Sequence, residues 1–458
     1  MMKNLTIREL KMGYEKKEFS PVEATKAYLE RIHQHQDLNA FITVCADEAL
    51  KQAEISEKKF LANDFTGMLE GIPLSYKDNL YTKGIRTTSG SKIAENFVPD
   101  TNAGAVRALQ REGAVNLGKV NLHEYAFGIT SNNPFYGPVK NPWNKEYTPG
   151  GSSGGSGAAV AASLCAASIG TDTGGSIRIP AASCGIVGLK PTYNLVDASG
   201  VTNISWSIDH VGPLTRNVDD LAMMMEALTG RSYLENLQED IRGLRVGVPN
   251  NYFNEQMDTE AAALYKQALH NLESLGAVLI DIDIPFTMDD LSLIFVLAIS
   301  EAGFVHENSL NTKIDEFGAD VRAAVEASRT FSALDYIKAL KRKAEITEQF
   351  EKLFGKVDVI ATPALPDTAQ KIGIETININ GKQEPLFDAM IRYPSVFNLT
   401  GQPALSIPTG FASNGLPAGL QLAAASFNEN ILIRAGYAYE QSFLKEFYEK
   451  RDKVSSLV

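Results

Sequence analysis

Glycine and serine occur at unusual density in Thr148–Gly157, and an alanine-rich stretch, Ala158–Ala167, follows at once. Glycine reaches backbone conformations that other residues avoid and lets a ligand approach the main chain closely. A flexible linker is the alternative interpretation, but the small apolar residues that follow favour close packing in the interior. We therefore expect a tight buried turn that leads into a helix and presents serine hydroxyls.

A second glycine-rich stretch, Gly170–Pro180, ends its paired glycines on Ser176. Consecutive backbone N–H groups around two glycines can form a nest for a developing oxyanion. Ser176 could therefore attack a carbonyl whose oxygen those amides receive. The same residues also fit a purely structural turn, capped by Asp172, in which Arg178 makes an ion pair. Taken alone, this stretch leaves both interpretations open.

A serine nucleophile needs a base, and the six histidines lie outside any recognisable triad signature. A buried lysine can serve instead if desolvation lowers its pKa and leaves it neutral. Lys77 follows the apolar run Ile72–Leu74 and precedes Asp78 and Asn79. Because most lysines are merely solvated, this context alone does not distinguish a base from a surface lysine.

Two further motifs would predict different functions. Gly151–Gly155 fits the GxSxG pattern, with Ser153 as nucleophile, but that class needs a downstream histidine and none has a fitting context. Gly113–Lys119 fits most of a phosphate-binding loop, but Val120 stands where a magnesium-binding Ser or Thr belongs. The sequence has no HExxH and no spaced Cys/His set. We therefore expect no metal and no nucleotide cofactor.

The charge balance narrows the possible partners. The 458-residue chain carries 43 basic and 55 acidic residues, a net charge of −12, which disfavours binding to phosphate backbones and anionic lipids. Its three cysteines form no CxxC pair, which is typical of a reducing compartment. No apolar run is long enough to span a bilayer, and the first residues do not resemble a signal peptide. We expect a cytoplasmic protein that acts on a small molecule and binds neither nucleic acid nor membrane.

A recurring helix–glycine–strand order predicts the fold class. A helix is expected over Asn102–Glu112 and a strand at Ala114–Leu117, and the same order returns at Ala261–Leu275 and Ala277–Ile284. Such alternation is typical of an α/β sheet with helices packed on its faces. Because no long Pro-, Ser- or Gly-rich linker separates independent parts, we expect a single large domain.

Taken in order, the longer motifs resemble those of the amidase signature family. The resemblance rests on Gly150–Gly157 with the alanines that follow, on Gly170–Pro180 and on Cys184–Thr192, while Gly71–Asn79 is similar to the family's lysine-bearing strand. It extends over nearly the whole chain through Gly212–Arg216, Ala361–Pro363 and Phe397–Gly419.

The resemblance implies a central mixed twisted β-sheet covered by helices on both faces. Residues 1–65 would be a helical N-terminal segment of this single domain, and residues 66–230 the signature core with the catalytic motifs. Residues 231–458 would complete the sheet and the substrate pocket.

A Ser-Ser-Lys triad follows from the same resemblance. Ser176 would be the acylated nucleophile, Ser152 the bridging serine held by a cis peptide, and Lys77 the base. Neutral Lys77 would take a proton from Ser152, which takes one from Ser176 as that oxygen attacks an amide carbonyl. The relay would need neither a histidine nor a cofactor. The backbone amides of the oxyanion hole would come from Thr173, Gly174, Gly175 and Ser176, and the supporting side chains from Ser153, Asp172 and Arg178.

The C-terminal half distinguishes branches of the family. We find no counterpart of the longer helical insertion, with its substrate-clamping arginine, that belongs to the glutaminase subunit of the tRNA-dependent amidotransferase. The acidic residue that would hold a glutamine α-amino group falls near Ile391, beside Arg392 and Tyr393. We therefore expect a free-standing amidase, monomeric or homodimeric, that cleaves a small carboxamide, anilide or carbamate, with ester or urethane hydrolysis as a side activity.

Two alternatives remain. One is the glutaminase subunit itself, working with partner proteins and an acyl-tRNA, and the other is a non-catalytic binding protein on the same fold. The segments expected to shape the substrate pocket are irregular, and the candidate residues within them are Tyr125, Ile129, Ile391 and Tyr393.

Overall fold

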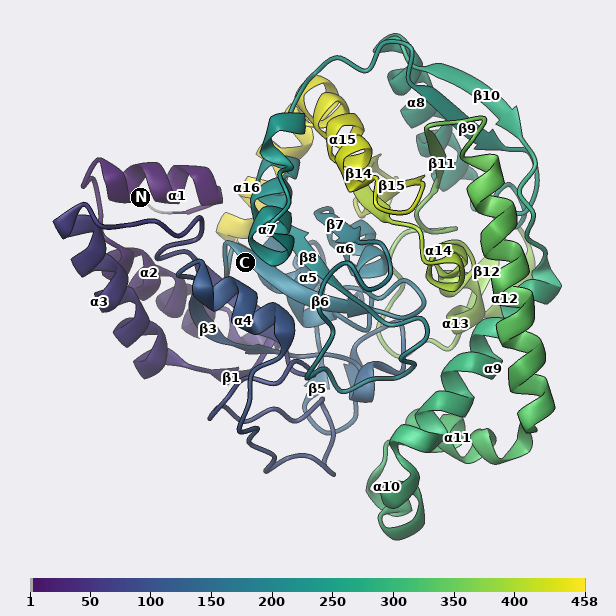
Figure 1. The fold of residues 1–458 in the computed structure, drawn as a ribbon, viewed down its shortest axis with the longest axis horizontal. Coiled ribbons are helices and arrows are strands. Elements are labelled where there is room, and N and C mark those ends of the chain that lie inside the picture. The colour runs from purple at the N-terminus through teal and green to yellow at the C-terminus, as the bar shows by residue number, and fades with distance from the viewer. Residues whose placement is uncertain (1–2, 458) are drawn as a thin grey trace.

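The computed structural model describes residues 3–457 of the chain (Figure 1). Within that range the centre of the molecule is an 11-stranded mixed sheet with helices packed against it. From one edge to the other its strands are β1 (Phe41–Val44), β3 (Val115–Val120), β2 (Pro73–Lys77), β6 (Ala167–Asp172), β8 (His210–Thr215), β7 (Val187–Lys190), β14 (Ala404–Phe411), β15 (Pro417–Ala424), β11 (Val359–Pro363), β9 (Arg245–Pro249) and β10 (Val278–Ile282). The single α/β domain predicted from the sequence is confirmed.

Strand direction changes across this sheet. Strands β3, β2 and β6 run parallel, as do β11, β9 and β10 at the other end, while successive neighbours from β6 through β8, β7, β14 and β15 to β11 are antiparallel. Two small antiparallel sheets lie outside it, one of β4 (Asn132–Asn133) with β5 (Gly137–Pro138) and one of β12 (Thr376–Ile379) with β13 (Lys382–Pro385).

The helices surround the sheet, and two groups of them lie at opposite ends of the molecule. Figure 1 shows α1 to α3 grouped at one end of the molecule and α9 to α12 at the other. The helices are α1 (Ile7–Glu15), α2 (Pro21–Gln34), α3 (Ala46–Ala62), α4 (Gly104–Arg111), α5 (Gly154–Ala161), α6 (Arg178–Cys184), α7 (Val218–Thr229), α8 (Thr259–Ser274), α9 (Met288–Val305), α10 (Glu307–Thr312), α11 (Ala319–Ala327), α12 (Ala333–Leu353), α13 (Leu386–Ile391), α14 (Ser395–Thr400), α15 (Glu429–Phe443) and α16 (Lys445–Leu457).

The expected helix–glycine–strand units are present. Helix α4 and strand β3 occupy the first, and α8 and β10 occupy the second, with each boundary within a few residues of the prediction. Gly113 and Gly276 stand between helix and strand with φ of +83° and +87°, a region that glycine enters without steric cost. The glycines therefore end the helices and let the chain turn back into the sheet.

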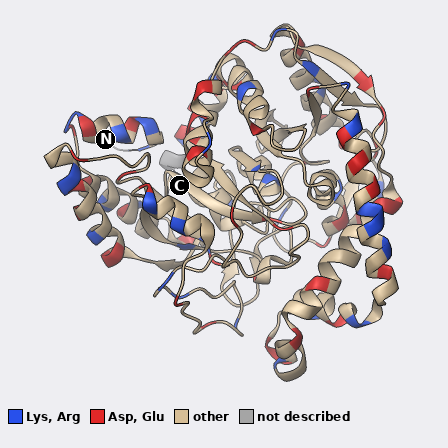
Figure 2. Cartoon of the chain, viewed as in Figure 1, with Lys and Arg blue, Asp and Glu red and all other residues tan. Residues whose placement is uncertain are grey.

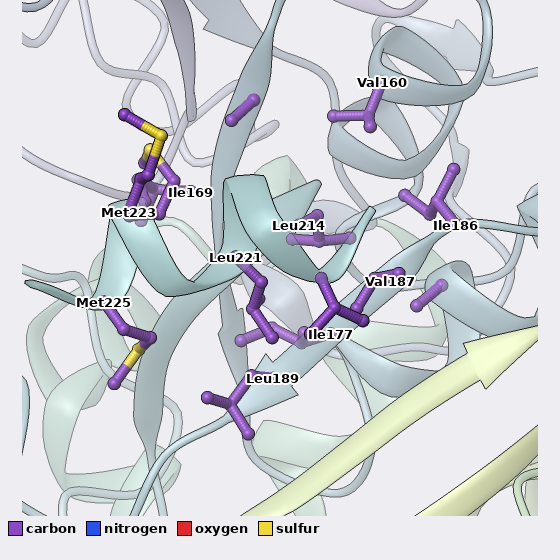
Figure 3. Packing of buried hydrophobic residues seen from close by; sticks show 14 of the residues in the cluster. Val160, Ile169, Ile177, Ile186, Val187, Leu189, Leu214, Leu221, Met223 and Met225 are labelled. Carbon is purple, nitrogen blue, oxygen red and sulfur yellow. The ribbon is translucent and has the colours of Figure 1, made fainter. Parts of the chain in front are cut away.

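The core packs directly behind the glycine-rich stretches. Figure 3 shows Ile177 lying among Val187 and Leu189 of β7, Leu214 of β8 and Leu221 of α7, all of them buried. Burying a side chain of this size contributes about 1.5–3 kcal/mol. The residue after Ser176 is thus anchored in the core, which fixes where Ser176 lies.

Charged side chains lie mostly on the outer helices. Figure 2 shows acidic and basic residues interspersed along helices such as α12, with few on the central strands. No helix in the described part of the chain combines the length and apolar character that crossing a bilayer would require.

Candidate active site

Lys77 is the last residue of β2, and its side chain is fully buried. Strand β6 runs parallel to β2 with Tyr76 opposite Ile169, so the carboxyl ends of both strands meet at one edge. There the Nζ atom of Lys77 lies 2.7 Å from Ser152 Oγ and 2.8 Å from Thr171 Oγ1. The amine therefore contacts hydroxyl groups rather than a carboxylate.

The surroundings of Lys77 favour its neutral form. Burial lowers the pKa of Lys77 to about 7, because the ammonium loses its hydration, and the charges of Asp172 and Asp209 oppose this change. A substantial fraction of Lys77 is consequently uncharged near neutral pH. A neutral amine at hydrogen-bond distance from a hydroxyl can accept its proton.

Ser152 lies in the tight turn that the small residues predict. The peptide bond between Gly151 and Ser152 is cis. A Cβ atom on Gly151 would lie 2.7 Å from the backbone carbon of Ile129, so only glycine fits there. The carbonyl of Ser152 accepts the His123 N–H and the Ser131 hydroxyl, both at 3.1 Å. These contacts fix the backbone that presents Ser152 to Lys77.

The neighbouring Ser153 has a different task. Its Oγ donates to the Thr171 carbonyl at 3.1 Å and accepts the Thr171 N–H at 3.3 Å. The side chain therefore fastens the turn before α5 to strand β6, and its backbone N–H donates to the Ser176 carbonyl at 3.3 Å. The turn that carries Ser152, in contact with Lys77, is thereby held against the loop that carries Ser176.

Asp172 organises the loop that carries Ser176. Its carboxylate accepts the N–H groups of Gly175 at 2.8 Å and Ile177 at 3.0 Å, and it pairs with the Arg178 guanidinium at 2.9 and 3.0 Å. Burial opposes the charge of Asp172, but the Arg178 charge and these hydrogen bonds hold its pKa below the ordinary value. The structural turn that the sequence left as one alternative, capped by Asp172 and paired with Arg178, is present in this loop, while the oxyanion nest stays a prediction.

The loop leaves other backbone donors available. Within the described residues, no protein acceptor takes the N–H groups of Thr173, Gly174 or Ser176, whereas the Gly175 N–H is already bound to Asp172. Gly175 has a φ of +123°, and a Cβ atom there would lie 2.6 Å from Pro394 Cγ. Glycine is therefore required at that position for the turn itself.

A cavity of about 490 Å³ opens onto Ser176, Gly174 and Thr173. Most of its wall is apolar, and no lysine or arginine of the described chain lines it. Several of the apolar lining residues come from three segments. They are Phe127 and Ile129 of the loop after β3, Ile294, Phe295 and Ala298 of α9, and Leu386, Phe387 and Ile391 of α13. The polar side chains at the wall include His123 and Asp320, whose Nε2 and Oδ2 atoms lie 2.5 Å apart.

Two of the four pocket candidates lie elsewhere. Ile129 and Ile391 line the cavity, but Tyr125 is turned by a φ of +47° and packs against His306 and Phe317. Tyr393 is fully buried and donates its hydroxyl to the Glu255 carbonyl at 2.7 Å.

Sequence reasoning missed the pocket residues of α9 and α11. Helix α9 is apolar on several sides, so its sequence does not indicate that one side would face a ligand rather than the core. No group of three or more His, Cys, Asp or Glu side chains in residues 3–457 is arranged to hold a metal ion.

Comparison with known proteins finds a matching family, similar sequences and similar folds. The chain matches the family described as Amidase over residues 23–433. It is 39% identical to a subunit of the glutamyl-tRNA(Gln) amidotransferase of Thermosynechococcus vestitus, over 95% of this chain and 97% of that protein. A solved structure described as an amidase has a TM-score of 0.91 and 32% identity, over 96% of this chain and all of that one. The structure of the corresponding amidotransferase subunit from Thermotoga maritima has a TM-score of 0.80 and 33% identity, over 96% and 95% of the two chains.

Proposed function

This chain belongs to the amidase signature family of C–N hydrolases, and from that premise we propose that it cleaves the amide bond of an apolar carboxamide, anilide or carbamate through an acyl-enzyme on Ser176. The observation that carries the proposal is the buried contact of 2.7 Å between Lys77 Nζ and Ser152 Oγ, beside a serine that opens onto an apolar cavity.

The reaction begins with proton transfer along the cluster. Neutral Lys77 accepts the Ser152 proton, and Ser152 accepts the Ser176 proton as Ser176 Oγ bonds to the carbonyl carbon. When the tetrahedral intermediate collapses, the C–N bond breaks and the leaving nitrogen receives a proton through the same two residues. Water then attacks the acyl-enzyme by the reverse relay, which releases the acid and restores Ser176.

The developing oxyanion requires backbone donors. We assign this role to the N–H groups of Thr173, Gly174 and Ser176, because no acceptor among residues 3–457 takes them, whereas the Gly175 N–H is held by Asp172. Asp172 and Arg178 then act on the reaction by fixing the loop. Ser153 acts by fastening the turn that presents Ser152.

The pocket favours an uncharged apolar substrate. A glutamine α-carboxylate would need a cationic partner, and the described lining offers Asp320 and Glu375 but neither lysine nor arginine. At the position predicted to contact the α-amino group, Ile391 faces the cavity.

The glutaminase subunit remains the second candidate function. Curated relatives with 36–39% identity are named as a subunit of glutamyl-tRNA(Gln) amidotransferase, for example those of Thermosynechococcus vestitus and Carboxydothermus hydrogenoformans. By their names, the sequence relatives therefore support this alternative better than the free-standing amidase. If it holds, the chain works as one component of a larger assembly and takes glutamine into the cavity.

Steady-state kinetics separate the two functions. We expect the purified chain to hydrolyse apolar anilides and carbamates, with glutamine turnover at least about a hundredfold lower in kcat/KM, because an unpaired buried carboxylate is costly. The same assays with Ser176→Ala measure the background. Glutamine hydrolysis that exceeds anilide hydrolysis, alone or after addition of candidate partner subunits, would establish the second function.

Covalent labelling tests the nucleophile directly. A sulfonyl fluoride should modify the protein once, and peptide mass spectrometry should place the adduct on Ser176. The matched variant Ser153→Ala keeps Ser176 and should still be labelled at that site. An adduct on Ser153 would instead support the GxSxG interpretation.

A further inference from the structure

Asp209 lies just before β8. Its carboxylate joins two parts of the site, the loop that carries Thr173 and the loop that carries Ile204. Its Oδ1 accepts the Thr173 hydroxyl at 2.6 Å. Its Oδ2 accepts the backbone N–H groups of Ile204 and Ser205 at 2.9 and 3.0 Å. Thr173 carries one of the free backbone donors, and Ile204 lines the cavity. One carboxylate thus holds the loop beside Ser176 and a piece of the pocket wall at the same time.

We propose that Asp209 is a positioning residue for the oxyanion hole: through the Thr173 hydroxyl it aims the free N–H groups of that loop at the substrate carbonyl, and through Ile204 it ties their position to the pocket wall. This inference rests on the proposed amide hydrolysis at Ser176. Asp209 acts only through Thr173 and the loop of Ile204, so it is not itself a catalytic residue.

The chain of contacts extends from Asp209 to the helix that forms the apolar wall. Glu301 of α9 is buried and accepts the Ser205 hydroxyl at 2.8 Å and the Ser207 N–H at 3.1 Å. Residues one and two turns earlier on α9 line the cavity. These contacts connect α9 to Thr173 through Ser205 and Asp209. In this series of contacts, Glu301 holds the end at the pocket wall, and Asp209 holds the end at Thr173.

Asp209 also acts on the base through its charge. The groups whose titration interacts with Asp209 are Lys77 at the end of β2, Glu301 on α9 and Tyr193. Burial raises the pKa of Asp209 to about 7, and the Glu301 charge adds to this effect. When ionised, Asp209 stabilises the Lys77 ammonium. Removing the charge therefore lowers the pKa of Lys77 and moves the acidic limb of the rate profile to lower pH.

The variant Asp209→Asn tests the proposal on an apolar anilide. Loss of one oxyanion donor typically costs about a hundred- to a thousandfold in rate. A displaced N–H group should cost only part of that, so we expect kcat to fall by about 10- to 100-fold. KM should change by less than about threefold, because the amide oxygen of asparagine can still accept the N–H groups of Ile204 and Ser205 and so keep this part of the pocket wall in place. The acidic limb of kcat/KM should also shift to lower pH, a change that a merely structural role would not produce.

Thr173 supplies an independent variant if Asp209→Asn folds poorly. Thr173→Val removes the same hydrogen bond from its other end and should lower kcat to a similar extent, whereas Thr173→Ser keeps the hydroxyl and should restore it. The double variant should be no slower than the slower single variant, because both act on one contact. Glu301→Gln, on the wall side, should raise KM more than it lowers kcat.

The outcomes separate this inference from the proposed function. If the wild type shows no Ser176-dependent amide hydrolysis, the proposed function fails. If it does hydrolyse the anilide, wild-type kcat and pH profile in Asp209→Asn would overturn the positioning role. Additive losses in the double variant would overturn it as well, since they would mean that Thr173 and Asp209 act independently.

Discussion

The polar cluster around Lys77 and Ser152, which we propose to be catalytic, and the pocket wall meet at Ser176, but the chain builds them in different ways. The cluster gathers polar groups that are almost fully buried at the ends of β2 and β6 and at the start of α5, and nearly every one has a named hydrogen-bond partner. The wall is apolar and is assembled from α9, α11, α13 and the loop after β3. Position is fixed by specific hydrogen bonds in the first region and by packing in the second.

The difference predicts how each region responds to substitution. A buried polar cluster tolerates little change, because each lost partner leaves another polar group unsatisfied. An apolar wall can change shape while the reacting atoms stay in place, so substitutions there should alter substrate choice before they alter chemistry. Variants in the two regions should therefore differ in which kinetic constant they change.

The largest expected effect comes from Ser176→Ala. If Ser176 is the nucleophile, turnover of an apolar anilide should fall by at least roughly ten-thousandfold, as when nucleophiles are removed from other serine hydrolases. The missing hydroxyl lies at the cavity, so the melting temperature should stay close to that of the wild type. Stopped assays and thermal melts measure the two quantities, and appreciable residual turnover would exclude Ser176.

Two buried lysines on adjacent strands sharpen the comparison further. Lys77 contacts hydroxyls, whereas Lys119 lies 3.3 Å from the Asp78 carboxylate and donates to the Leu80 carbonyl at 2.7 Å. Lys77→Met should lower kcat by about a thousandfold or more. It should cost less folding free energy than Lys119→Met, because it leaves two neutral hydroxyl groups rather than a carboxylate without a partner. Lys119→Met should instead cost about 3–5 kcal/mol of folding free energy, because it leaves Asp78 buried without its cation.

Chemical denaturation and steady-state rates distinguish the two lysines. Reversed results, with an active Lys77→Met or an undisturbed Lys119→Met, would mean that the roles of these residues are assigned the wrong way round. The two variants are matched controls for each other, because both lysine side chains are fully buried and lie on neighbouring strands.

The pH dependence is the next smaller effect. If Lys77 is the base, its active form is neutral, and burial lowers its pKa to about 7. Below that value kcat/KM should fall about tenfold per pH unit, and above it the rate should level off. Rates on an anilide between pH 5 and 9, with the protein shown to stay folded throughout, measure this limb. A flat profile across pH 7 would contradict a lysine base with this pKa.

The two regions also explain what the sequence could predict. Lys77, Ser152 and Ser176 lie in continuous motifs that resemble those of the amidase signature family, so the resemblance could assign them roles that their local context alone left open. Phe295 and Asp320 reach the cavity only because α9 and α11 pack beside the loop after β3, and no short pattern encodes that packing. Their position depends on contacts between segments about 170 to 200 residues apart.

Tyr125 and Tyr393 are predicted from the sequence to line the pocket, but neither lines the cavity. Both are aromatic residues in segments near the site, but the φ of Tyr125 turns its ring toward His306. Arg392, next to Tyr393, forms an ion pair with Glu384 and is not among the described residues that line the cavity. Side-chain direction in such segments depends on dihedral angles that residue type alone does not set.

The smallest expected effect comes from the wall. Ile391 lines the cavity, whereas Tyr393, two residues later, does not. Ile391→Ala should lower kcat/KM for a bulky apolar anilide by about tenfold, mainly through KM, because methylene groups in a pocket contribute about 1–3 kcal/mol. The matched variant Tyr393→Phe loses only the hydrogen bond to the Glu255 carbonyl, so it should lower stability by about 1 kcal/mol and leave kcat/KM unchanged. If Tyr393→Phe alters substrate choice and Ile391→Ala does not, the wall lies elsewhere, and the division between a polar catalytic cluster and an apolar selecting wall fails.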